Sequence, residues 1–209
     1  MARLHITLLI VLVLLILGFG LSFLTRGNTE FLIYVGVISF FTAIIALSLQ
    51  KVSYTTATLI SLTIWAAMHL AGGGVFIAEG RLYDVMLIPL SEKVPVFRYD
   101  QLVHVWGFFA STLVMYCLIA SAMGERIRSS VSLSIVVVMA GLGVGAFNEI
   151  VEFVLTLIVP STGVGGYMNT ALDLCADLVG AVFGWTYIRV RYLPERAMAT
   201  VPDTGSDNH

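Results

Sequence analysis

Carboxylate side chains occur inside the apolar runs of this sequence, where they are costly. The stretch NEIVEF, residues 148–153, places Glu149 and Glu152 about one helical turn apart among Val, Ile, Phe and Leu residues. An aspartate at the centre of a membrane helix costs about 2.5–3.5 kcal/mol on insertion scales. Two carboxylates at this spacing should also repel each other. The stretch therefore indicates either a buried hydrogen-bond network or a bound cation.

Further acids and two histidines have spacings that place them together on helix faces. Asp100 and His104 are four residues apart, as are Asp173 and Asp177, and His69 lies at the end of another apolar run. Residues four apart stack on one side of a helix. Together with the two glutamates they make five carboxylates and two imidazoles. Five anions in a low-dielectric pocket cannot all stay ionised without a compensating cation.

A carboxylate and imidazole set of this kind predicts a divalent metal site. Carboxylate oxygens and imidazole nitrogens suit Mg, Mn, Fe or Zn. The four positions expected to lie deepest are the predicted ligands: His104, Glu149, Glu152 and Asp177. Asp100 or Asp173 is left for acid–base catalysis, and the predicted supporting residues are His69, Tyr99 and Asn148.

Composition places these residues in a membrane protein. Of the 209 residues, 58% are hydrophobic and only 11% are charged, against about 25% charged in soluble domains. The net charge is −2, and no basic patch with interleaved aromatics is present, so a nucleic-acid partner is excluded. Cys117 and Cys175 both lie in apolar runs and are predicted to be packing residues rather than zinc ligands or a disulfide.

Six runs are long enough to cross a bilayer, which takes about 20 predominantly apolar residues. The predicted fold class is therefore all-α: a polytopic membrane helix bundle with six transmembrane helices. The expected domain covers residues 1–193, and a polar tail, residues 194–209, is predicted to be disordered and cytoplasmic. The spans are expected at about 6–24, 31–49, 54–71, 99–122, 131–159 and 168–190.

Basic residues in the connections predict the orientation. With the N-terminus inside, the cytoplasmic segments hold seven of them and the outer segments four: Arg26, Arg81, Lys93 and Arg98. Positive charge collects on the cytoplasmic side, so both termini are expected there, in a multi-pass protein of the plasma (inner) membrane. The longest connection, residues 72–98, is then outside.

This topology brings the polar residues to one depth, in the outer half of the bilayer. The third and fifth helices end on the outer side, and the fourth and sixth begin there. The polar stripes of the fifth and sixth helices each contain a G-x-x-x-G, Gly141 with Gly145 and Gly180 with Gly184, which lets helix backbones approach closely. We expect the last three helices to pack together with these stripes facing inward.

Purely structural interpretations stay open beside the metal site. Thr170 and Asp173 fit a helix-capping box. Asp100 could be a first-turn acid stabilised by the helix dipole, or it could pair with Arg98. His69, beside the glycine triplet at 72–74, could bond a freed backbone carbonyl. The four deeper residues could form only a hydrogen-bond network that locks helix packing.

The runs FRYDQLVHVWGFF, NEIVEF and NTALDLCADLVGA, with MHLAGGG and LYDVMLIPL, resemble the YjdF-type family of uncharacterised bacterial inner-membrane proteins. The resemblance covers roughly residues 60–185. More distantly, the chain is also similar to VanZ-like proteins. The chain departs from the family pattern at Asn148 and in the connection PSTGVGGYMN, which lacks the expected acidic and Trp residues. The resemblance implies the membrane fold but no established activity. It also implies a set of recurring residues, matched here by His69, Tyr99, Asp100, His104, Glu149, Glu152, Asp173 and Asp177.

Three functions are compatible with these patterns. The first is a metal-dependent enzyme acting on a lipid-like substrate that enters from the outer leaflet. The second is an ion- or proton-coupled transporter, although no inverted repeat or broken helix supports it. The third is a structural or accessory membrane protein. Membrane lipid is the expected partner, and the sequence identifies no substrate, reaction or oligomeric state.

Overall fold

The computed structural model describes residues 2–89, 96–124 and 127–193. Six long helices account for most of this chain, and all six are long and apolar enough to cross a membrane. They are α1 (Ala2–Thr25), α2 (Thr29–Ser48), α3 (Thr56–Gly74), α4 (Tyr99–Met123), α5 (Val131–Ile158) and α6 (Tyr167–Tyr192). The predicted all-α bundle of six membrane-spanning helices is thereby confirmed. The tail expected to be disordered, residues 194–209, lies outside the described residues.

Polar residues at the helix starts satisfy backbone N–H groups that would otherwise lack partners. The side chains of Asn28, Thr55 and Ser130 accept hydrogen bonds from backbone amides at the starts of α2, α3 and α5. At the start of α4 the Gln101 side chain accepts from the Arg98 amide at 2.8 Å. Short polar residues in the connections thus define where the apolar helices begin.

One helix-capping interpretation is wrong, and one helix is longer than expected. Helix α6 begins at Tyr167, with Gly166 in the capping position, so Asp173 lies well inside the helix and the capping-box interpretation is wrong. Helix α3 continues through the glycine triplet to Gly74. The glycines leave room for aromatic rings, because a Cβ at Gly72 or Gly73 would collide with Tyr83 or Phe31.

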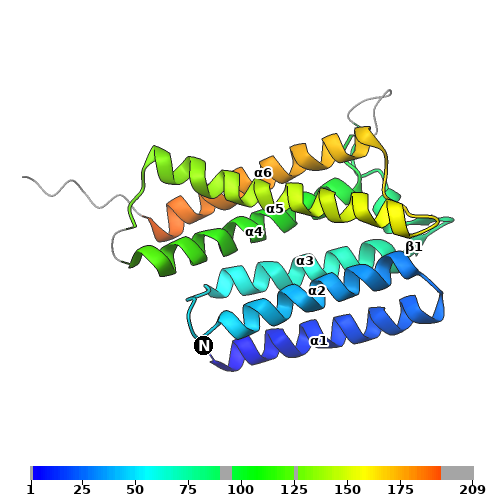
Figure 1. Ribbon diagram of the computed structural model, residues 1–209, viewed down its shortest axis with the longest axis horizontal. Helices are drawn as coiled ribbons and strands as arrows, with labels where there is room; N and C mark the ends of the chain where they lie inside the picture. Colours follow the sequence, from blue (N-terminus) through cyan, green and yellow to red (C-terminus); the bar gives the residue numbers. More distant parts are fainter. Residues whose placement is uncertain (1, 90–95, 125–126, 194–209) are drawn as a thin grey trace, which may run out of the picture.

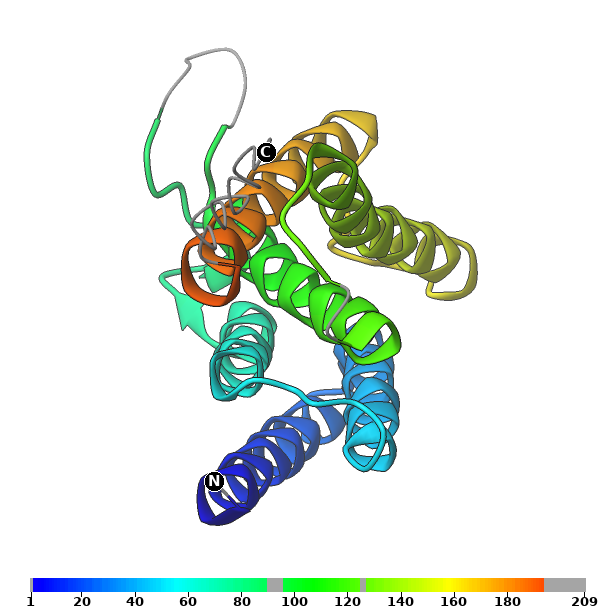
Figure 2. The ribbon, with the colours of Figure 1, turned by 90° about the vertical axis from the view of Figure 1, so that its left-hand side faces the viewer.

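The helices form two groups of three that lie side by side (Figure 1). One group is α1 to α3, and the other is α4 to α6; α3 packs against α4 and joins them. Seen along the helices, α5 lies at the edge of the bundle beside α4 and α6 (Figure 2). Helix α1 begins at the end of the bundle where helix α6 finishes.

The glycine stripes bring the last three helices into close contact, as expected. A Cβ at Gly180 or Gly184 of α6 would meet the backbone carbonyl oxygens of Val105 or Phe109 on α4. On α5, Gly141 faces Thr112 and Gly145 faces the Asp177 carboxylate. Side chains beside these glycines therefore face the interior of the three-helix group.

The described part of the connection from α3 to α4 covers the end of the bundle. It forms a short hairpin, β1 (Phe76–Ile77) with β2 (Gly80–Arg81), followed by a 3-10 turn, η1 (Leu82–Asp84). An isolated bridge between Met86 and Arg98 leads back to α4. This segment places Arg81 and Tyr83 over the end of the bundle where α3 and α5 finish.

Candidate metal and ligand site

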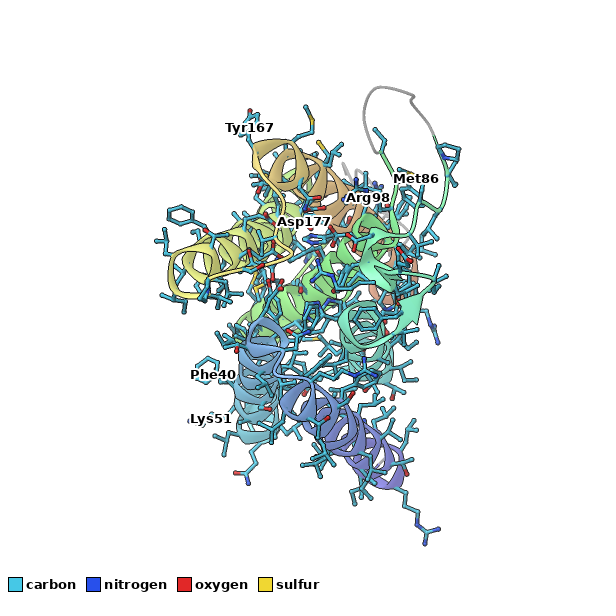
Figure 3. The ribbon with its side chains drawn as sticks, turned by 90° about the vertical axis from the view of Figure 1, so that its right-hand side faces the viewer. Phe40, Lys51, Met86, Arg98, Tyr167 and Asp177 are labelled. Atoms are coloured by element: carbon cyan, nitrogen blue, oxygen red, sulfur yellow. The ribbon has the colours of Figure 1, made fainter. Side chains whose placement is uncertain are left out.

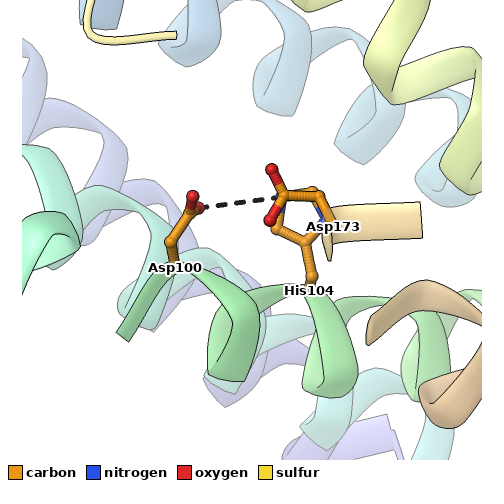
Figure 4. A group of neighbouring side chains, drawn as sticks. All are labelled: Asp100, His104 and Asp173. Carbon is orange, nitrogen blue, oxygen red and sulfur yellow. Dashed lines mark ion pairs between the residues drawn. The ribbon is translucent and has the colours of Figure 1, made fainter. Parts of the chain in front are cut away.

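His104 on α4 is the centre of the polar cluster. Its Nδ1 lies 2.8 Å from Oδ1 of Asp177 on α6, and its Nε2 lies 3.7 Å from Oδ1 of Asp100, one turn earlier on α4. Figure 4 shows Asp100 and His104 rising from α4 toward Asp173 on α6. His104 and Asp177 are both buried. Because Asp177 occupies Nδ1, Nε2 is the ring nitrogen left for a ligand or a proton.

Asp173 is fully buried and held by two amide side chains. Gln101 Nε2 donates to its Oδ1 at 2.6 Å, and Asn169 donates to its Oδ2. Asn169 also donates to Oδ2 of Asp100 at 3.3 Å. Asp100 forms no ion pair with Arg98 within the described chain, so that interpretation is not supported.

The two glutamates of α5 have different surroundings. Asn148 donates to Oε1 of Glu152 at 3.0 Å. Glu149 is 9% exposed, and neither of its carboxylate oxygens has a hydrogen-bond partner among the residues the structure describes. The side chains of Asn148 and Thr170 lie near it without meeting hydrogen-bond geometry. A buried carboxylate without partners is costly, so Glu149 has unused capacity to bind a cation.

Two sets of three residues bring one ligand atom each to within 4.8 Å of one another. They are His104 with Glu149 and Glu152, and His104 with Asp100 and Asp173. A cation with oxygen and nitrogen ligands at about 2.0–2.2 Å would draw such atoms together by roughly an ångström. The donor types fit a divalent metal. Asp177, predicted as a fourth ligand, belongs to neither set and instead contacts His104.

This cluster borders an open cavity at the end of the bundle, although Glu149 and Asp173 are not among the residues that line it. Figure 3 looks at this end of the molecule, with Asp177 among the last three helices and Arg98 closer to the α3–α4 connection. His104, Asp100 and Glu152 line the cavity together with side chains from α2 and α3. The cavity is therefore built jointly by both groups of helices.

The predicted supporting residues lie in the cavity wall or beside it. Nδ1 of His69 lies 2.6 Å from the Tyr83 hydroxyl, so His69 bonds a side chain and not a freed backbone carbonyl. Burial raises the pKa of Tyr83 well above its usual value, which keeps the phenol protonated and able to donate. The Tyr99 hydroxyl donates to the Met68 carbonyl at 3.1 Å, which fixes α4 against α3.

Sequence reasoning missed a second polar group at the cavity mouth. Oε2 of Glu30 on α2 lies 3.4 Å from Nη1 of Arg81 and accepts from the Gly163 amide at 2.9 Å. Arg81 Nε also lies 3.5 Å from Asp84. The only sequence signal was an acid in the first turn of a span, which the helix dipole alone would explain. Gln101 and Asn169, the partners of Asp173, were missed as well.

A family model described as a predicted membrane protein, DUF2238, matches residues 4–193. The chain belongs to this family of predicted membrane proteins. The match covers all six helices almost completely, so this chain is an integral, multi-pass membrane protein. No curated protein and no solved structure matches the chain. The expectation that the chain belongs to an uncharacterised family of membrane proteins is confirmed.

Proposed function

We propose that this protein binds a divalent cation at the base of the cavity, through His104, Glu149 and Glu152. The observation that carries the proposal is the Glu149 carboxylate, which is buried, has no hydrogen-bond partner among the described residues and lies beside two further ligand atoms. An uncompensated buried anion is strongly unfavourable, and a bound cation removes that cost. Three protein ligands also leave coordination positions open to water or substrate, as in catalytic metal sites.

The activity that this site supports best is a metal-dependent reaction on a lipid-like molecule. A divalent cation there, Mg, Mn, Fe or Zn, would polarise a phosphoryl or carbonyl oxygen or lower the pKa of bound water. Asp100 is the better candidate for proton transfer, because its side chain is 20% exposed at the cavity and lies near His104. Asp173 is fully buried and holds two amide donors, so it serves better to position Gln101 and Asn169.

The YjdF-type and VanZ-like resemblances bring no established activity, so the proposal depends on the geometry alone. We place the cavity on the outer side of the inner membrane, with both termini in the cytoplasm, because the count of basic residues favours that orientation. A lipid-like substrate would then enter from the outer leaflet.

Metal analysis of purified protein tests the proposal. We expect close to one Mn(II) or Zn(II) per wild-type chain after loading, and almost none in Glu149→Gln with Glu152→Gln. The matched control is Glu79→Gln, which makes the same change at an exposed position of the hairpin and should leave metal content unchanged. Equal metal content in wild type and the double variant contradicts the site. Metal-independent, substrate-dependent proton flux in liposomes would favour the transporter alternative.

A further inference from the structure

The cavity mouth contains two arginines, Arg81 and Arg98, beside the acids Glu30 and Asp84. Both arginines belong to the connection between α3 and α4. Arg81 is already neutralised, because it contacts Glu30 at 3.4 Å and Asp84 at 3.5 Å. Arg98 is therefore the remaining cation at the mouth.

The Arg98 guanidinium has no ion pair and no hydrogen bond among the described parts of the chain. Its backbone amide donates to Gln101, which fixes the main chain at the start of α4. The nearest acid in sequence, Asp100, contacts His104 and Asn169 instead. A half-buried arginine that borders a cavity without an anionic partner has its donors available to a ligand.

Other features of the mouth also favour an anion. Helices α4 and α6 both begin at this cavity, and Gly163 and Gly165 before α6 are part of its wall. The N-terminal end of a helix carries partial positive charge. The same cavity has an aromatic wall formed by Phe31, Tyr34, Trp65 and Phe108, which suits an organic group attached to the anion.

We infer that the ligand of this cavity carries a phosphate group, bound between Arg98 at the mouth and the cation at the base. The inference rests on the proposed cation site. A planar guanidinium matches two phosphate oxygens at once, and a third oxygen remains for the metal. Arginine and a divalent cation together neutralise the charge of a phosphoryl group. The phosphate could belong to a lipid headgroup or to free inorganic phosphate.

Calorimetric titration of Mn(II)-loaded protein in detergent tests this assignment. The probes are inorganic phosphate, dioctanoyl phosphatidic acid and, as the phosphate-free control, dioctanoylglycerol. In Arg98→Gln we expect phosphate binding to weaken about tenfold, because one charged hydrogen bond contributes about that factor to affinity. The affinity for Mn(II) should stay unchanged. Arg98→Lys should restore part of the loss. The matched control is Arg26→Gln, because Arg26 contacts Gly74 and Phe76 and does not line the cavity.

The outcomes separate the two proposals. Mn(II) binding without binding of either phosphate probe overturns the phosphate assignment and leaves the cation site in place. Equal losses in Arg98→Gln and Arg26→Gln also overturn it, because the effect would then be one of overall charge. Absence of Mn(II) binding overturns the cation site and the phosphate assignment with it. Tighter binding of phosphatidic acid than of inorganic phosphate supports a lipid headgroup, and the reverse order supports free phosphate.

Discussion

Oδ1 of Asp177 lies 2.8 Å from Nδ1 of His104, and neither residue is more than slightly exposed. A carboxylate in contact with one ring nitrogen fixes the orientation and tautomer of a histidine whose other nitrogen binds metal. Asp177 thus has the geometry of a residue that positions His104. The sequence had predicted it as a direct ligand.

Replacing Asp177 by Asn should weaken metal binding without abolishing it. Loss of a carboxylate partner of a ligating histidine costs about 10- to 100-fold in metal affinity. Titration with Mn(II) measures this loss, and Asp84→Asn at the cavity mouth is the control that should leave affinity unchanged. Complete loss of binding would make Asp177 a ligand after all, and unchanged affinity would deny it any role in positioning His104.

Glu149→Gln should change thermal stability in opposite directions with and without metal. In excess Mn(II) the variant should melt below wild type, because it loses the stabilisation that metal binding contributes. In EDTA it should melt at the same temperature or higher, because the change removes an unpaired buried charge. Differential scanning fluorimetry in both buffers measures the sign.

The control for this prediction is Glu79→Gln, an exposed glutamate for which both buffers should give the wild-type value. Lower melting temperatures of Glu149→Gln in both buffers would indicate a structural carboxylate. Equal or higher values in both would leave a hydrogen-bonded seam between helices and reject the metal site.

Cysteine labelling can determine on which side the cavity opens. Cys175 is exposed and Cys117 is buried, so the background carries Cys175→Ser. We expect Glu79→Cys, in the hairpin beside the cavity, to react with a membrane-impermeant maleimide in intact cells. Ser129→Cys, in the connection at the opposite end, should react only after permeabilisation. The reverse pattern would place the cavity on the cytoplasmic side.

Gly180→Ala should destabilise the protein by about 1–3 kcal/mol, as overpacking of a close contact does. Its new Cβ would meet the backbone carbonyl of Val105, which cannot move aside as a side chain can. Gly143 on α5 has open space around it, so Gly143→Ala is the matched control and should be neutral or slightly stabilising. Unfolding in mixed micelles compares the two, and similar effects would contradict close packing of α4 on α6.

Much of the fold was predictable because it depends on local properties of the chain. A run of about 20 apolar residues must become a helix in a bilayer, since each backbone polar group needs a partner within the segment. Spacings of three and four residues then assign Glu149, Glu152 and Gly145 to one face of one helix. The sequence alone therefore determined the six helices, the inward face of α5 and α6, and the convergence of acids near His104.

The pairings within that cluster were decided only by the tertiary structure. The contacts of Glu30 with Arg81 and Gly163 join residues 51 and 133 positions apart. Asp177 contacts His104, whereas Glu149 has no hydrogen-bond partner among the described residues. A one-residue change in register shifts a helix by about 1.5 Å and turns its side chains by about 100°. Which carboxylate contacts the histidine, and which has no hydrogen-bond partner among the described residues, thus depends on how neighbouring helices pack and not on spacing along any one of them.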